Sequence, residues 1–256
     1  MRGGKRRHKR EMTRDIIPQK LAILHNAEEL LRQKARSMIA DDARLQLHLA
    51  VTEAAMDLAD VLRQFNSSDE DLRVAVVLGM RTFNAFAASI KLTLSGYRQN
   101  SALILRDVLE TVFLLDLFAG DPSLIERWRH ADKKARMKDF SPVKVREALD
   151  ARDGFTSKKR FEMYELFSEL AGHANMKSSW MMRPQKDGDA VIGPFMEATS
   201  LEAVISEMGR LAVQVGEQLN RFFPANWEQG MPPRVAFAQL KQNWINRFYP
   251  TAASER

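Results

Sequence analysis

The stretch from Arg98 to Gly120 limits the fold more than any other part of the sequence. At 100° per residue, its apolar side chains fall on every side of a helix, and Leu103 shares an arc with Arg106 and Glu110. A helix that is apolar all round is typical of the centre of a protein, because neighbouring elements cover all of its faces. We therefore expect other helices to pack around this segment.

Arg106 and Glu110 bring charge into this central segment. They lie one turn apart on one face, which is the spacing of a helical ion pair. Removing one member of a buried pair costs about 3–5 kcal/mol, so the two residues are expected to act together. The pair is either a structural contact that fixes how three helices meet, or a polar site in which Arg106 binds an anion such as phosphate and Glu110 orients it.

Capping signals divide the rest of the chain into helices. Acidic residues at 69–71 follow two serines and open a helix that Gly96 ends, so this helix and the central segment form an antiparallel hairpin. Thr199 and Glu202 have the spacing of a capping box and predict a long helix through Phe223.

One segment breaks the helical pattern. Asp187-Gly188 lies between short apolar runs at 180–182 and 190–192, which is a β-hairpin signal. No internal repeat, alternating βαβ pattern or glycine-rich phosphate loop is found. The sequence therefore predicts an all-α fold, a multi-helix bundle of about eight helices with one small β-hairpin insertion at about residues 178–196.

Three parts are expected along the chain: a disordered basic arm at 1–14, a helical bundle domain at 15–224 that contains the hairpin, and a C-terminal helical extension at 225–256. The arm holds seven Lys and Arg against one Glu, a balance of +6 that equals the net charge of the whole chain. It is either a solubilising extension or a nucleic-acid contact, because clustered basic side chains release counterions from phosphate. The arm residues expected to bind nucleic acid are Lys5, Arg6, Arg7, Lys9 and Arg10.

Two segments of the body carry opposite charge. Residues 127–160 have a balance of +7, and residues 41–71 one of −6. They can pair within the protein or between subunits, and the basic segment can also meet phosphate. Within it, Arg129, Lys133 and Lys134 form either a solvated helical face or a surface for RNA or a partner protein.

Composition excludes several classes of function. The absence of cysteine rules out disulfides, thiolate catalysis and zinc sites that need cysteine. Residues 74–94 come closest to a membrane span, but Arg81 and Lys91 interrupt them. The N-terminus lacks the apolar core of a signal peptide. We expect a cytoplasmic protein with no membrane contact, no cofactor and no metal.

His173 is the histidine of most interest, because it follows a helix end directly after Gly172, whereas His8, His25 and His48 have no convincing partners. It is either a histidine favoured by the negative end of a helix, or a general base or phosphate contact. In the second interpretation, supporting hydrogen bonds come from Tyr164, Ser168 and Asn175.

Two motifs resemble a known family. The run from Ser101 to Glu110, with its Arg106-x-x-x-Glu110 spacing, and the segment from Tyr164 to His173 are similar to motifs of the HEPN-like family of bacterial all-α proteins. The resemblance covers about residues 75–220. Many members are encoded near toxin or phage-defence genes, and the resemblance implies a helical bundle that often forms homodimers.

The resemblance also implies a chemistry. In active HEPN ribonucleases, an Arg and a His separated by four to six residues meet across the dimer and cleave RNA without metal. This sequence departs from that pattern, because no Arg precedes His173 at that distance. Either activity is absent, or Arg106 replaces the missing arginine from another helix.

The expected function is therefore an RNA-associated protein of defence or toxin type. In one form it is a metal-independent endoribonuclease with Arg106, Glu110 and His173 as catalytic residues. In the other it is a non-catalytic, dimerising adaptor or regulator whose basic arm contacts nucleic acid.

Overall fold

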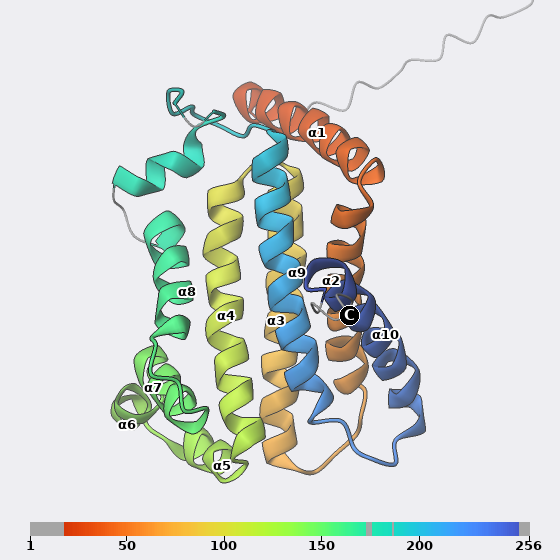
Figure 1. Cartoon of the computed structure of the whole chain (residues 1–256), viewed down its shortest axis with the longest axis vertical. Coiled ribbons are helices and arrows are strands. Elements are labelled where there is room, and N and C mark those ends of the chain that lie inside the picture. The colour runs from red at the N-terminus through yellow and green to blue at the C-terminus, as the bar shows by residue number, and fades with distance from the viewer. Residues whose placement is uncertain (1–17, 173–175, 186, 251–256) are drawn as a thin grey trace, which may run out of the picture.

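The computed structural model describes residues 18–172, 176–185 and 187–250, and it is built from helices (Figure 1). Nine α-helices in these ranges have eight or more residues, one more than predicted, and α6 has seven. The all-α class is thus confirmed. In chain order the helices are α1 (Gln19–Ala40), α2 (Ala43–Leu62), α3 (Glu70–Leu94), α4 (Arg98–Gly120), α5 (Ser123–His130), α6 (Lys133–Asp139), α7 (Pro142–Arg152), α8 (Lys159–Phe167), the π-helical η1 (Ser168–Gly172), the 3₁₀ helix η2 (Met176–Met182), α9 (Ala198–Asn220), the 3₁₀ helix η3 (Glu228–Gly230) and α10 (Met231–Phe248).

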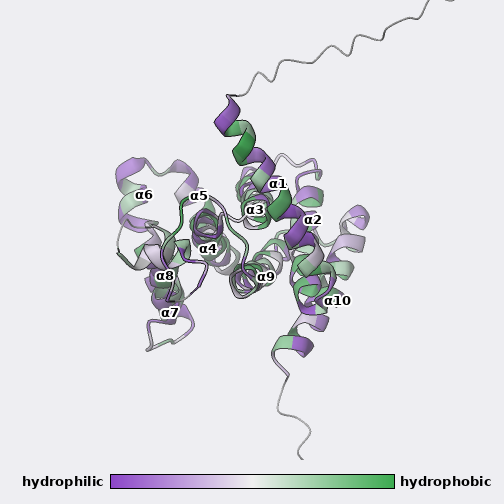
Figure 2. Cartoon of the chain, turned by 90° about the horizontal axis from the view of Figure 1, so that it is seen from above, coloured by the Kyte–Doolittle hydropathy of each residue, from purple (hydrophilic) through white to green (hydrophobic). Residues whose placement is uncertain are grey.

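Four long helices, α2, α3, α4 and α9, pack side by side and enclose the main core. Seen from above, their facing sides are hydrophobic, whereas α6 is largely hydrophilic (Figure 2). Small residues allow these helices to approach closely. Gly79 on α3 has no side chain, and a Cβ added there would lie 3.2 Å from Leu219 on α9 and 3.6 Å from Ala59 on α2. The large side chains Phe86, Leu109 and Met208 are fully buried in this core.

The helix α4 is central, as the sequence predicts, but it is not covered on every side. It contacts α3, α9, α7, α8 and η1. Its hydrophobic side chains toward α3 and α9, such as Leu105 and Leu109, are buried, but Leu103 keeps 42% of its surface exposed. The expectation of a helix buried all round is therefore wrong for this face, because no described element covers the side on which α3 and α4 lie next to each other.

The predicted β-hairpin is not formed within the described part of residues 178–196. Its first half continues the 3₁₀ helix η2, and one backbone hydrogen bond, from Val191 N–H to the Met182 carbonyl (3.0 Å), links the two flanks. The Arg98 guanidinium takes the carbonyls that a strand would use, since it donates to Met181 (2.5 Å), Trp180 (3.3 Å) and Arg183. A side chain 80 residues away in sequence thus overrides the local turn signal.

Helix α9 begins at a different cap from the one predicted. The side chain of Glu197 accepts hydrogen bonds from the backbone N–H groups of Thr199 and Ser200, both at 2.8 Å. Glu202, the expected partner of Thr199, instead forms an ion pair with Arg44 on α2 (3.1 Å).

The C-terminal segment 225–250 packs directly on the bundle through α10. Phe237 and Trp244 are buried in the main core, and Trp244 Nε1–H donates to Nδ1 of His48 on α2 at 2.9 Å. Phe248 stacks on the same imidazole at a centroid distance of 4.1 Å. The interpretation of His48 as a residue without partners is therefore wrong, because its partners lie almost 200 residues away in sequence.

Among the described helices, α3 is the one long and apolar enough to cross a membrane by length and composition. In the bundle it packs against α2, α4 and α9 and buries Val74, Leu78 and Phe86. Its apolar composition is accounted for by this position in the core.

Candidate functional site

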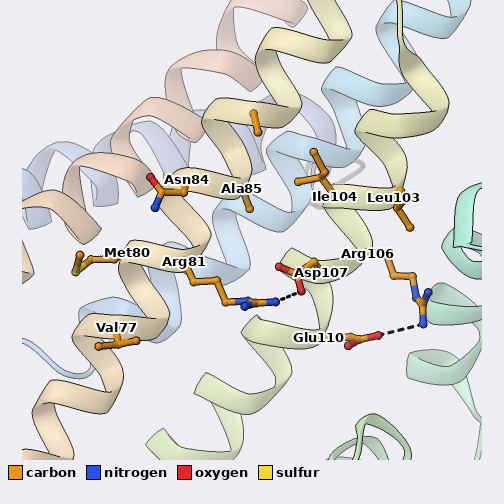
Figure 3. Close-up of a pocket in the computed structure, with 11 residues that line it drawn as sticks. Val77, Met80, Arg81, Asn84, Ala85, Leu103, Ile104, Arg106, Asp107 and Glu110 are labelled. Carbon is orange, nitrogen blue, oxygen red and sulfur yellow. Dashed lines mark hydrogen bonds and ion pairs between the residues drawn. The ribbon is translucent and has the colours of Figure 1, made fainter.

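Arg106 and Glu110 form the ion pair that their spacing predicts. Nη2 of Arg106 lies 3.3 Å from Oε1 of Glu110, and the two side chains keep 20% and 29% of their surface exposed. They are half-buried at the side of α4 rather than deep inside the bundle. Both point away from α3, whereas Arg81 reaches across from α3 to Asp107 (Figure 3).

The Arg106 guanidinium is held from the opposite side by α8 and η1. It donates a hydrogen bond to the hydroxyl of Tyr164, and its Cζ lies 4.7 Å from the centroid of that ring. A Cβ at Gly172 would lie 2.7 Å from Nη1 of Arg106. The absence of a side chain at residue 172 therefore lets the chain lie directly against the guanidinium.

A second arginine, which the sequence did not single out, contacts the same tyrosine. Arg146 on α7 is 4% exposed, and its Cζ lies 4.0 Å from the centroid of the Tyr164 ring. Burial lowers the pKa of the Arg146 guanidinium, with Glu110 opposing this shift and Arg106 adding to it. The available signal was weak: Arg146 lies three residues before Leu149 and so shares the inward face of a short helix.

Three polar atoms around Tyr164 have no hydrogen-bond partner in the described part of the chain. They are Nε of Arg106, Nη1 of Arg146 and Oγ of Ser168, and all three are buried. Buried polar atoms are usually paired, so a cluster of unpaired ones indicates strain or a place for a ligand. Ser168 also begins the π-helical η1, and π-helical turns are frequent at functional sites.

The charges of this cluster do not cancel. Arg106 and Arg146 contribute two positive charges, and Glu110 contributes one negative charge, so the group around Tyr164 carries an excess of +1. An uncompensated charge in a poorly solvated site is costly, and a bound anion would offset it. The arrangement is thus suited to binding an oxyanion.

A groove between α3 and α4 lies beside the cluster. The groove has a volume of about 830 Å³ and is lined by Arg106 and Glu110 together with Arg81 and Asp107 of the neighbouring ion pair (Figure 3). Arg106 thus contributes both to the lining of this groove and to the cluster around Tyr164.

The residues predicted to act with Arg106 and Glu110 divide into those that the structure describes and those that it does not. Tyr164 accepts a hydrogen bond from Arg106, and Ser168 follows Tyr164 by one helical turn; both were predicted to support His173. His173, Asn175 and the arm residues Lys5, Arg6, Arg7, Lys9 and Arg10 lie outside the described residues. Gly172, directly before His173 in the sequence, is the last described residue on that side of the gap.

One arginine of the basic segment pairs with the acidic segment within the chain. Arg129 forms ion pairs with Glu70 and, at 3.4 Å, with Asp71 at the start of α3. Lys133 and Lys134 are exposed on the first turn of α6. The charge of Arg129 is thus largely neutralised, and the two lysines remain available to an anionic partner.

No metal site is apparent in the described ranges, where no three His, Asp or Glu side chains gather as ligands would. No protein-family model matches the chain, and no curated protein or solved structure is significantly similar to it. The likeness to HEPN proteins therefore rests on the two sequence motifs and enters below as a proposal.

Proposed function

We propose that this chain is a cytoplasmic, RNA-associated HEPN-like protein of defence or toxin type that cleaves RNA without metal. In this proposal Arg106 binds a backbone phosphate, Glu110 positions Arg106, and His173 acts as acid or base on the ribose 2′-OH. The arm and the lysines of α6 supply further phosphate contacts.

The observation that carries the proposal is the setting of Arg106. Its guanidinium is oriented by Glu110 and Tyr164, and its buried Nε has no partner in the described part of the chain. Gly172, the residue directly before His173, lies against it. An arginine that is held in place but keeps a free N–H is suited to donate to a phosphate oxygen, because its planar fork matches that geometry.

The chemistry follows from these groups. The 2′-oxygen attacks the adjacent phosphorus while its proton passes to His173, and the bond from phosphorus to the 5′-oxygen breaks. The leaving 5′-oxygen takes up a proton from water, which gives a 2′,3′-cyclic phosphate and a 5′-hydroxyl end. Arg106 stabilises the charge that develops on the non-bridging oxygens, a contribution that is typically large for such donors.

Cleavage of labelled RNA by the purified protein in EDTA tests the proposal. We expect cyclic-phosphate products from the wild type and a loss of at least 100-fold in Arg106→Ala and His173→Ala, since each removes a direct contact to the reacting group. Circular dichroism confirms that both variants are folded. Intact RNA under all conditions, or equal activity of the two variants and the wild type, would contradict it.

The second candidate function is a non-catalytic adaptor, which the low exposure of Arg146 and the pairing of Arg106 with Glu110 favour. Deletion of residues 1–14 separates the two. A protein that binds nucleic acid through the arm alone loses its affinity and the salt dependence of binding, whereas a ribonuclease keeps its turnover at the Arg106 site.

We also propose a homodimer, formed over the face that α3 and α4 leave open. Val77, Met80 and Leu103 are exposed there around the neutral Arg81–Asp107 pair, so two copies can meet without like-charge repulsion. Light scattering after size-exclusion chromatography should give a dimer for the wild type and a monomer for Val77→Asp/Leu103→Asp. A monomeric wild type at 50 μM would exclude this arrangement.

A further inference from the structure

We infer that Arg146 and Arg106 together form a binding site for one singly charged phosphodiester group, with Tyr164 between them and Ser168 as a third donor. The inference deepens the proposed function and rests on it, since it assumes that Arg106 faces the RNA backbone. The inferred site contains Arg146 as a second, buried arginine, and it binds one phosphate group at a time.

The contacts on Tyr164 place the donors together. The Arg106 and Arg146 guanidiniums lie 4.7 Å and 4.0 Å from the centroid of one aromatic ring, so both pack on the same tyrosine. Ser168 follows Tyr164 by four residues, one helical turn further along the same face. Each of the three side chains has one unpaired, buried polar atom.

Nearby arginines show what a purely structural arginine looks like in this chain. Arg152, on the same helix as Arg146, forms two hydrogen bonds with the carboxylate of Asp116, both at 3.0 Å, and a third with Asp153 at 2.7 Å. Arg160 pairs with Asp150 at 2.6 Å and also with Asp153. Arg146 forms no ion pair with a carboxylate in the described ranges, and it is more deeply buried than either.

The excess charge selects the ligand. Arg106, Arg146 and Glu110 sum to one positive charge, and a phosphodiester carries one negative charge at neutral pH. A phosphodiester therefore leaves the bound site neutral, whereas a terminal phosphate with two charges would leave an excess of −1 beside Glu110. Two planar guanidiniums and a hydroxyl also match the tetrahedral oxygens of phosphate.

The test measures binding of a fluorescent 2′-O-methyl RNA hexamer to the full-length protein by anisotropy. Such RNA has no free 2′-OH and cannot be cleaved by the proposed route, so binding is measured without turnover. A hexamer with uncharged methylphosphonate linkages is the ligand control, and inorganic phosphate, followed by calorimetry, tests the free anion as the source. Arg152→Met is the matched protein control, because it removes the same charge from the same helix.

We expect Arg146→Met to weaken hexamer binding at least tenfold and Ser168→Ala about threefold, while Arg152→Met stays within twofold of the wild type. In phosphate-free buffer, Arg146→Met should melt at the same temperature as the wild type or higher, because it removes a buried, unpaired charge. The stabilisation that the wild type gains from the hexamer should be lost in this variant.

Equal hexamer affinities for Arg146→Met and Arg152→Met would overturn the inference. So would a lower melting temperature of Arg146→Met with unchanged affinity, which is the result for a structural arginine. Binding of inorganic phosphate without binding of the hexamer would exclude a phosphodiester as the ligand. If Arg146→Met does not fold, Arg146→Lys keeps the charge but not the fork, and affinity equal to that of the wild type would again overturn it.

The outcomes separate this site from the proposed enzyme. Arg146-dependent hexamer binding without cleavage of ordinary RNA would leave the phosphodiester site standing and remove the ribonuclease. Cleavage that depends on Arg106 and His173 but not on Arg146 would support the ribonuclease and exclude the phosphodiester site.

Discussion

At the scale of single residues, His48 shows how the tertiary fold decides the charge of a side chain. The imidazole is 4% exposed, accepts a hydrogen bond from Trp244 and stacks on Phe248. Burial lowers its pKa to about 4, and the positive charges of Arg210 and Arg44 add to the shift, whereas Asp42 opposes it. His48 is therefore a neutral acceptor that joins α2 to α10.

This pKa predicts a dependence of stability on pH. Between pH 6.5 and about 4 the unfolded chain binds a proton at residue 48 and the folded chain does not, so the free energy of unfolding falls as the pH is lowered through this window. The full contribution is present above pH 6.5, and we expect a loss of about 3 kcal/mol by pH 4. Urea unfolding of wild type and His48→Gln measures it, and an equal pH slope for both proteins would contradict the assignment.

Two members of the Arg106–Tyr164–Arg146 cluster could be predicted from the sequence, and the third could not. The sequence supplied the Arg106–Glu110 pair from helical spacing and Tyr164 from the HEPN-like motif. It could not supply Arg146, because one arginine among twelve Lys and Arg in residues 127–160 becomes special only when α7 packs on α4.

At the scale of elements, the start of α9 depends on one carboxylate. Burial by itself would raise the pKa of Glu197, but hydrogen bonds from Ser200 and Thr199 outweigh it and lower the pKa to about 2. These bonds satisfy N–H groups that the first turn of a helix leaves free. Helix α9 packs against α2, α3 and α4, so its cap supports the whole bundle.

We expect Glu197→Ala to lower the free energy of unfolding by about 1–2 kcal/mol, the range for a lost N-cap. Glu202→Ala is the control, because its ion pair with Arg44 is exposed and such pairs contribute at most about 1 kcal/mol. Since the pKa of Glu197 is lowered, its contribution is complete above pH 4.5 and is lost as the pH falls toward 2. Chemical denaturation at pH 7 and pH 3 tests both statements, and a larger effect of Glu202→Ala would favour the capping box instead.

At the scale of the whole molecule, α10 closes the bundle on the side of α2. A Cβ at Gly216 on α9 would lie 2.2 Å from the ring of Phe237, so this glycine makes room for the docked helix. Phe237 and Trp244 both belong to the main core. The C-terminal segment is therefore integral to the described fold.

Truncation after Ala225 tests this role of α10. Burying a large apolar side chain contributes about 1.5–3 kcal/mol, and total stabilities are about 5–15 kcal/mol, so losing Phe237, Trp244 and their neighbours should abolish cooperative unfolding. Thermal melts followed by circular dichroism measure the effect. Trp244→Phe keeps most of the apolar contact and should fold with a lower melting temperature, whereas a truncated chain that melts like the full-length protein would show that α10 is dispensable.

The sequence by itself determined the helical class, the central place of the segment 98–120 and the two ends of the helix before it. These depend on periodicity, on caps such as Asp69 and on Gly96, whose φ of +88° favours glycine; all are local properties. The predicted hairpin at residues 178–196 was wrong, because Arg98 binds the carbonyls that a hairpin would need. The predicted cap of α9 was also wrong, because Glu197 is the cap.

Only the tertiary structure decided which charges remain unbalanced. Helical spacing fixes Arg106 next to Glu110 because both lie on one helix. The position of Arg146 against Tyr164, and the neutral state of His48 against Trp244, arise between helices that are distant in the chain. Burial and partners at such distances depend on the packing of the whole molecule, and no local pattern encodes them.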